Sequence, residues 1–153
     1  MVREKCDAND PERFLGQSVA TGHCVPYVQA ASGAPLTRDW RRGVPVKGGN
    51  IPRGTAIATF DPDGTYGNHT DGRSHAAILK EEVAGGLLVW DQWRNAPPMP
   101  DQVVHERLIR FRAGQGIAVN DGDIFLWWRW SQLTVEPRAN RPCDRAENTP
   151  CRS

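Results

Sequence analysis

The stretch Gly22-His23-Cys24-Val25-Pro26-Tyr27-Val28-Gln29 predicts a turn that opens directly into a short helix. Pro26 falls in the first helical turn, where a proline needs no amide hydrogen, and Gly33 supplies a residue at which the helix can stop. Cys24 therefore lies at the helix N-terminus, on the same side as Val28. Unpaired backbone amides and the helix dipole favour the thiolate there, so we expect the pKa of Cys24 to fall below the usual value of about 8.5.

After this helix the sequence predicts a run of antiparallel strands, and a helix followed by such a run indicates an α+β fold. The expected loops cover residues 34–52 and 61–73, with Trp40 anchoring the first loop to the body of the domain. Trp127, Trp128 and Trp130 are expected to fill the core. The expected strands are runs of β-branched and aromatic residues between turns, at residues 54–60, 75–80, 87–93, 104–111 and 124–130.

The totals suit one soluble domain in a chain of 153 residues. A net charge of +1 gives no general attraction for nucleic acid or an anionic membrane, and no apolar run approaches the ~20 residues of a membrane span. The charged start of the chain, with no apolar segment behind it, predicts that there is no secretory signal. We expect a single domain over residues 1–135 and a tail without a core over residues 136–153.

The four cysteines form no pair at metal-ligand spacing, so we expect neither a structural metal nor a cofactor. Cys143 and Cys151 lie close enough in the tail to close a small loop as a disulfide in an oxidising compartment. Cys6 has no assigned role.

A hairpin centred on Val83 would place His75 directly opposite Asp91, with Cβ atoms about 4.5–5.5 Å apart. Asp91 would then orient the imidazole of His75 and leave its other nitrogen for Cys24. A nucleophile, a base and an orienting carboxylate are what a thiol hydrolase needs. Gln92, which would point to the other face of the sheet, is the alternative third member.

Other interpretations of the same residues are simpler. A cysteine by itself is more often a small buried apolar residue than a nucleophile. His69, Asp71 and His75 are a conceivable set of metal ligands, but their spacing is generic and the loop is long, so solvated loop residues are the preferred interpretation. His23 is expected to form a wall of the cleft or to be exposed, and His105 is expected to point outward from its strand.

The order of the motifs resembles that of the CHAP and NlpC-type papain-fold amidases. The resemblance rests on Gly-His-Cys-Val at 22–25, the strand Gly-Thr-Ala-Ile-Ala-Thr-Phe at 54–60, His-Ala-Ala-Ile-Leu at 75–79 and Trp-Asp-Gln-Trp at 90–93. The chain is most similar to the small bacterial amidase effectors of type VI secretion systems, which cut peptidoglycan peptides. The resemblance implies a papain-like fold whose cysteine-bearing helix packs on an antiparallel sheet. It assigns Cys24 as nucleophile, His75 as base and Asp91 as the third polar residue.

The resemblance also implies a substrate, an amide bond in peptidoglycan stem peptides or cross-links. The cross-link between meso-diaminopimelate and D-alanine is favoured over the bond between D-glutamate and diaminopimelate. The Cys24 backbone amide would be the first oxyanion donor, Gln17 is the candidate for the second, and His23 and Trp93 are candidates for contacts with substrate.

An effector of this kind would be made in the cytoplasm without a signal peptide, exported by type VI secretion, and active in the periplasm of a target cell. It would require a cognate immunity protein. A non-catalytic module of the same fold that binds the cell wall or a partner is the alternative function, motivated by six tryptophans and the tail.

Overall fold

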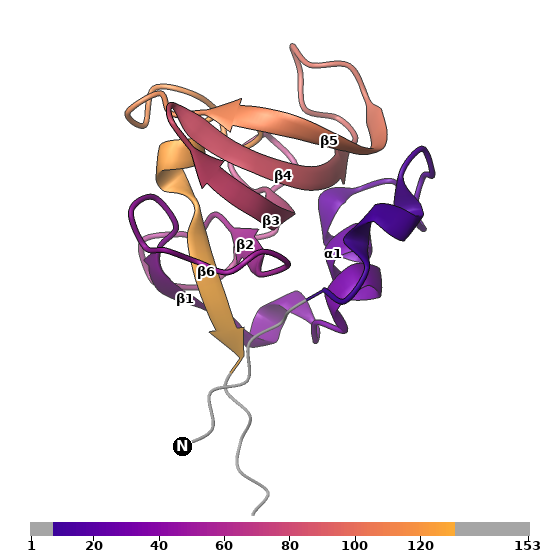
Figure 1. Cartoon of the computed structure of the whole chain (residues 1–153), viewed down its shortest axis with the longest axis horizontal. Coiled ribbons are helices and arrows are strands. Elements are labelled where there is room, and N and C mark those ends of the chain that lie inside the picture. Colours follow the sequence, from indigo (N-terminus) through magenta and orange to yellow (C-terminus); the bar gives the residue numbers. More distant parts are fainter. Residues whose placement is uncertain (1–7, 131–153) are drawn as a thin grey trace, which may run out of the picture.

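The computed structural model describes residues 8–130, in which one α-helix packs against one antiparallel sheet. The six strands lie in the order β1-β6-β2-β3-β4-β5, and every pair of neighbours is antiparallel. Figure 1 shows α1 and the segment before it on one side of the sheet, where α1 contacts β3 and β4. The α+β, papain-like architecture is thus confirmed. The elements are η1 (Pro11–Phe14), α1 (Cys24–Ser32), η2 (Thr37–Asp39), β1 (Trp40–Pro45), β2 (Ala56–Ala58), β3 (Ala76–Val83), β4 (Gly86–Trp93), β5 (Gln102–Arg110), η3 (Gly122–Ile124) and β6 (Leu126–Trp130).

The helix begins and ends where its local sequence predicts. Gly22 turns the chain with a φ of +81°, His23 is the extended N-cap residue, and Cys24 is the first helical residue. Gly33 ends the helix in the left-handed region at a φ of +69°, and its amide donates to the Gln29 carbonyl. These features are local in sequence, so the position of Cys24 follows from them without any tertiary contact.

Two apolar clusters cover the two faces of the sheet. The cluster under α1 contains Tyr27, Val28, Ile78 and Trp90, with Trp40 stacked on Trp128 at a centroid distance of 4.1 Å. Trp128 is almost completely buried, which confirms its expected core position, and Trp40, expected to anchor the segment 34–52 to the body of the domain, is equally buried. Trp127 packs partly buried against the opposite cluster, and the side chain of Trp130 lies outside the described residues. The opposite cluster contains Val46, Ile57, Ala77, Leu79, Leu87, Val89, Ile109 and Phe125.

Strand β1 is absent from the sequence prediction, which treats residues 34–52 as a loop. In the structure β1 pairs with β6 at the edge of the sheet. Its residues after Trp40 are mostly exposed, and it ends at Pro45, as suits an edge strand. Such a segment carries little of the alternating hydrophobic pattern by which strands are recognised.

The β3–β4 hairpin has a different register from the predicted one. Val83 pairs with Gly86 across a turn at residues 84–85, and the ladder shifts by one residue between Leu79 and Glu81, so Lys80 is the extra residue. Beyond it Ile78 pairs with Trp90, and continuing by one residue sets Ala77 opposite Asp91. The predicted direct opposition of His75 and Asp91 is therefore wrong by two residues. Because the error is even, both residues stay on one face and become diagonal neighbours.

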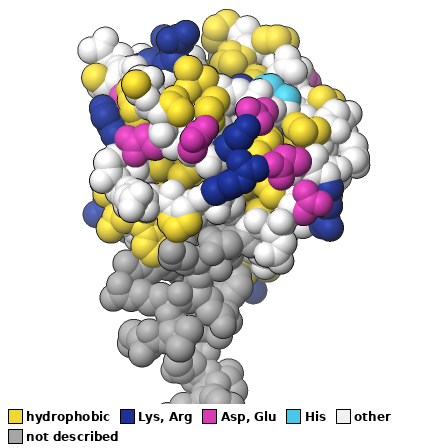
Figure 2. Space-filling model, in the orientation of Figure 1, with side chains coloured by type: hydrophobic (Ala, Val, Ile, Leu, Met, Phe, Trp, Pro, Cys, Tyr) yellow, Lys and Arg dark blue, Asp and Glu magenta, His cyan; other side chains and the backbone are white. Residues whose placement is uncertain are grey.

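The surface is of mixed charge. On the face shown in Figure 2, acidic and basic side chains lie interspersed among apolar ones, in keeping with the net charge of +1. No helix within residues 8–130 is long and apolar enough to cross a membrane. Cys6, Cys143, Cys151 and the expected boundary between residues 135 and 136 lie outside the described part of the chain.

Candidate active site

Cys24 is a free thiol at the mouth of a pocket of about 350 Å³. Its side chain is half-buried, so it is both partly desolvated and reachable from the pocket. The walls come from α1, the loop between β2 and β3, and the end of β4. His75, Tyr66 and Trp93 line the same pocket, which brings together residues far apart in the sequence.

Gln92 fixes the backbone that leads into Cys24. Its side chain is fully buried, its Oε1 accepts from the Val19 amide at 2.8 Å, and its Nε2 donates to the Val19 carbonyl at 2.9 Å. The same Nε2 donates to the carbonyl of His23, the residue before the cysteine, at 2.7 Å. Gln92 therefore points to the helix side of the sheet, as its position next to Asp91 predicts, and its amide is fully used in holding this loop.

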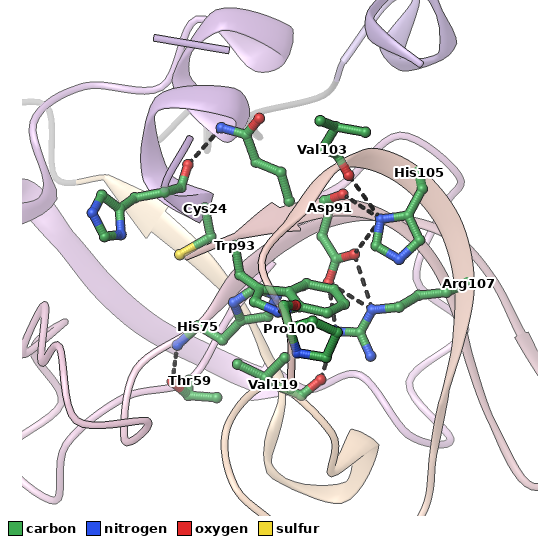
Figure 3. A network of polar contacts seen from close by, with 12 residues as sticks. Cys24, Thr59, His75, Asp91, Trp93, Pro100, Val103, His105, Arg107 and Val119 are labelled. Atoms are coloured by element: carbon green, nitrogen blue, oxygen red, sulfur yellow. Dashed lines mark hydrogen bonds and ion pairs between the residues drawn. The ribbon is translucent and has the colours of Figure 1, made fainter. Parts of the chain in front are cut away.

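His75 lies directly before β3, and Thr59 holds its backbone. The His75 amide donates to Thr59 Oγ1 at 3.0 Å, and the Thr59 amide donates to the His75 carbonyl at 3.0 Å. The His75 ring packs edge-on against Trp93 and Phe125. Its Nε2 donates to Asp91 Oδ2 at 2.7 Å, so Nδ1 is the nitrogen left for the thiol. Figure 3 shows Cys24, His75, Asp91 and Arg107 in succession.

Asp91 is fully buried, and a cation holds its charge. Arg107 on β5 donates from Nε to both carboxylate oxygens at 3.0 and 3.1 Å, and from Nη2 to Oδ2 at 2.6 Å. Arg107 also donates to the Val119 carbonyl, and its guanidinium lies over the Trp93 ring at 4.5 Å. The ring of His105 lies beside Asp91 as well and donates from Nδ1 to its backbone carbonyl at 3.1 Å (Figure 3). Arg107 thus holds the carboxylate of Asp91 in place, and His105 holds its backbone.

The pKa values of the three central groups move in the directions that an ion pair requires. Burial alone would raise the pKa of Cys24, but the charge and hydrogen bond of His75, helped by Tyr66 and the Ala76 amide, lower it below its usual value. Burial alone would lower the pKa of His75, but the charge of Cys24 and the hydrogen bond to Asp91 raise it to about 9. Burial alone would raise the pKa of Asp91, but Arg107 and His75 lower it to about 2. The geometry therefore stabilises a thiolate beside an imidazolium.

Tyr66 is a further polar group at the sulfur. Its hydroxyl lies 3.7 Å from Cys24 Sγ, and its ring packs against Trp40 and Phe60. Burial, and then the negative charge of Cys24, hold the pKa of Tyr66 well above its usual range. The phenol therefore keeps its proton when the thiol ionises, and it can donate to the thiolate.

The structure brings together Cys24, His75 and Asp91, and it places His23 and Trp93 on the pocket wall. Gln17 lies elsewhere. Its side chain is exposed, its Nε2 donates to the Arg13 carbonyl at 2.9 Å, and it does not contribute to the pocket.

The proposed metal ligands are directed to three different partners. His69 bonds Asp61 at 2.8 Å, Asp71 pairs with Arg73, and His75 pairs with Asp91. His105 differs from its expected outward position, because its side chain is only partly exposed and donates to the backbone carbonyl of Asp91.

Sequence reasoning missed Arg107, Tyr66 and the role of Gln92. Arg107 lies diagonal to Asp91, since β4 and β5 pair Val89 with Arg107 and Asp91 with His105. Extending the predicted strand pairing to β5 would have placed Arg107 next to Asp91, so the sequence pattern could have predicted this contact. Tyr66 left none, because it lies in a long loop whose path only the tertiary structure fixes.

Comparison with known proteins gives matches along most of the chain. The sequence model of the family described as "Domesticated amidase effector 2" matches residues 1–127. The chain is 37% identical over 100 residues to the type VI secretion amidase effector 2 protein of Salmonella typhi, covering 65% of this chain and 71% of the relative. It is 36% identical over 119 residues to domesticated amidase effector 2 of Ixodes scapularis, covering 72% of this chain and 75% of that protein. The solved structure of a type 6 secretion amidase effector 2 is similar with a TM-score of 0.66 at 25% identity, covering 84% of this chain and 96% of the other.

Proposed function

The chain belongs to the domesticated amidase effector 2 family, and from that membership we propose that it hydrolyses amide bonds of peptidoglycan with Cys24 as nucleophile. The observation that carries the proposal is the place of the thiol. Cys24 sits at a helix N-terminus, opens into a pocket, and interacts with a buried histidine that a carboxylate orients. A structural cysteine needs none of these partners.

In the proposed reaction the Cys24 thiolate attacks the carbonyl carbon of the scissile amide, and the carbonyl electron pair moves onto oxygen. The Cys24 backbone amide, free at the helix start, donates to that oxyanion. When the tetrahedral intermediate collapses, the C–N bond breaks and the His75 imidazolium protonates the leaving amine. His75 then takes a proton from water, which attacks the thioester and releases the carboxylic acid and the thiolate. Asp91 keeps the ring aligned in both steps.

The favoured substrate is the cross-link between meso-diaminopimelate and D-alanine, with the D-glutamate–diaminopimelate bond second. The relatives are named as type VI secretion effectors, which supports export to the periplasm of a target cell. A cognate immunity protein that covers the pocket is the expected partner. Adding that protein should block alkylation of Cys24 by iodoacetamide.

The first test is digestion of purified cell walls by Cys24→Ala. Because the thiol is only half-buried, the variant should fold and unfold like the native protein while releasing no new muropeptides. Mass spectrometry of the native digest identifies the bond that is cut. Iodoacetamide should abolish native cleavage and a chelator should leave it unchanged. Undiminished cleavage by Cys24→Ala would falsify the proposal.

A further inference from the structure

Among residues 8–130, no acidic side chain lines the pocket next to Cys24, although the chain has 18 acidic residues. Arg94 is the one lysine or arginine among the described residues of its lining, which also include His23 and Asn95. The imidazolium of His75 is balanced by the thiolate of Cys24, so the charge of Arg94 is the one that this lining leaves uncompensated. That charge favours a ligand that carries a negative group.

Arg94 has no partner within the described residues. Among residues 8–130 its guanidinium enters no hydrogen bond or ion pair, whereas Arg53, Arg73 and Arg107 each bond a carboxylate. Its side chain is exposed at the pocket rim. A guanidinium left free beside a pocket retains its full set of donors for a ligand.

The backbone on either side places Arg94 close to the nucleophile. A Cβ atom added to Gly22 would lie 2.6 Å from Arg94 Nε, so the arginine lies against the chain two residues before Cys24. Gly22 is thus required twice, once for its φ of +81° and once for the room that Arg94 takes. Trp93, the residue before Arg94, is almost completely buried and donates from Nε1 to the Pro100 carbonyl at 2.8 Å. These contacts hold the backbone from which the Arg94 side chain extends.

We propose that Arg94 binds a free carboxylate carried by the substrate beside the scissile amide. This inference rests on the proposed function and narrows its substrate class. A planar guanidinium binds a carboxylate through two parallel hydrogen bonds, but the neutral amide that replaces it in amidated peptides offers only one acceptor oxygen. The favoured cross-link meets the requirement, because diaminopimelate carries a carboxylate on the carbon whose amine forms that bond. In the alternative bond D-glutamate is linked through its side-chain carboxyl, so its free carboxylate lies farther from the scissile amide.

The test compares two muropeptides that differ only in whether this carboxylate is free or amidated. The native protein should cleave the free form with a kcat/KM on the order of 10-fold to 100-fold higher, the range of a charge-assisted pair. Arg94→Gln should lose that preference by losing rate on the free form alone. Arg110→Gln is the matched control, because Arg110 is an exposed residue of β5 outside the pocket. It should behave like the native protein.

Two further measurements separate the outcomes. Alkylation of Cys24 should proceed equally in the native protein and Arg94→Gln, because His75, Tyr66 and the Ala76 amide are the groups that lower the pKa of Cys24. Binding of both muropeptides to Cys24→Ala, with and without Arg94→Gln, measures recognition without turnover. If Cys24→Ala binds the free form more tightly than the amidated form, and Arg94→Gln removes that difference, the inference is supported even if the native protein cleaves neither peptide. Equal binding of the two forms, or a preference that survives Arg94→Gln, overturns it and leaves the proposed hydrolysis standing.

Discussion

Replacing Arg107 with methionine should destabilise the protein through Asp91 rather than through Arg107 itself. Methionine retains an apolar stem against Trp93 but removes every donor that Arg107 gives to the carboxylate. Asp91 has no exposed surface, so its charge would keep the hydrogen bond from His75 and the longer contact of 3.9 Å between Oδ1 and His105 Nδ1. Removing one partner of a buried ion pair typically costs about 3–5 kcal/mol, because the other charge is left without compensation.

The pKa of Asp91 gives an independent magnitude. A fall from 3.8 to about 2 corresponds to about 2 kcal/mol of stability. Because the pKa is lower in the folded state, this contribution is complete above pH 4 and is lost as the pH falls toward 2. Allowing for the bond from His75 that remains, we expect Arg107→Met to lower the free energy of unfolding by roughly 3 kcal/mol at pH 7. For a chain of this size that lowers Tm by roughly 6–12 °C.

Urea unfolding of the native protein and Arg107→Met from pH 7 to pH 2 measures this effect. Arg110→Met, an exposed change on the same strand, is the control and should stay within about 0.5 kcal/mol of the native protein. The gap between native and Arg107→Met should narrow below pH 4. A loss no larger than that of Arg110→Met, or a gap that does not depend on pH, would refute the assignment of the stability to the Asp91 charge.

The remaining predictions concern the thiol. The thiolate and imidazolium coexist between the lowered pKa of Cys24 and the raised pKa of His75, so alkylation of Cys24 should already be fast at neutral pH, and amide hydrolysis should fall as the pH rises through about 9. Alkylation that rises only near the usual thiol pKa of about 8.5 would contradict this. Tyr66→Phe keeps the ring packed against Trp40 and Phe60 and removes the hydroxyl, so the pKa of Cys24 should rise and alkylation at neutral pH should fall roughly tenfold with stability unchanged. An alkylation profile that overlies the native one would show that the phenol does not act on the sulfur.

The position of Cys24 at the helix N-terminus was predictable because its determinants are neighbours in sequence. Gly22, Pro26 and Gly33 bound the helix through their own backbone preferences, and Cys24 needs nothing else to reach the N-terminus. The face shared by His75 and Asp91 was predicted correctly only because two errors in the predicted hairpin cancelled: the turn lies at residues 84–85 and not at Val83, and the extra residue Lys80 shifts the ladder back to the predicted parity. The prediction of direct opposition failed because neither the turn position nor the extra residue leaves a clear mark in the sequence.

The residues that surround the site depend on long-range structure. Arg107 reaches Asp91 only through the pairing of β4 with β5, and Gln92 reaches Val19 and His23 only because α1 packs on the sheet. Strand β6 enters the sheet between β1 and β2, although it comes last of the described strands in the chain. Local propensity contains no information about such neighbours, so the sequence alone predicts the grouping of Cys24, His75 and Asp91 better than it predicts the residues that contact them.

Lys80 is the residue that an unbroken β3–β4 ladder would not have. If Lys80 instead paired regularly with β4, every residue of β3 before it would move to the opposite face of the sheet. The imidazole of His75 would then point to the face that α1 covers, away from the carboxylate of Asp91. Deleting Lys80 would preserve the arrangement, because Leu79 would still pair with Val89 and every residue before Leu79 would keep its partner on β4. The contact between His75 and Asp91 therefore tolerates the loss of Lys80 better than the loss of the bulge that Lys80 forms.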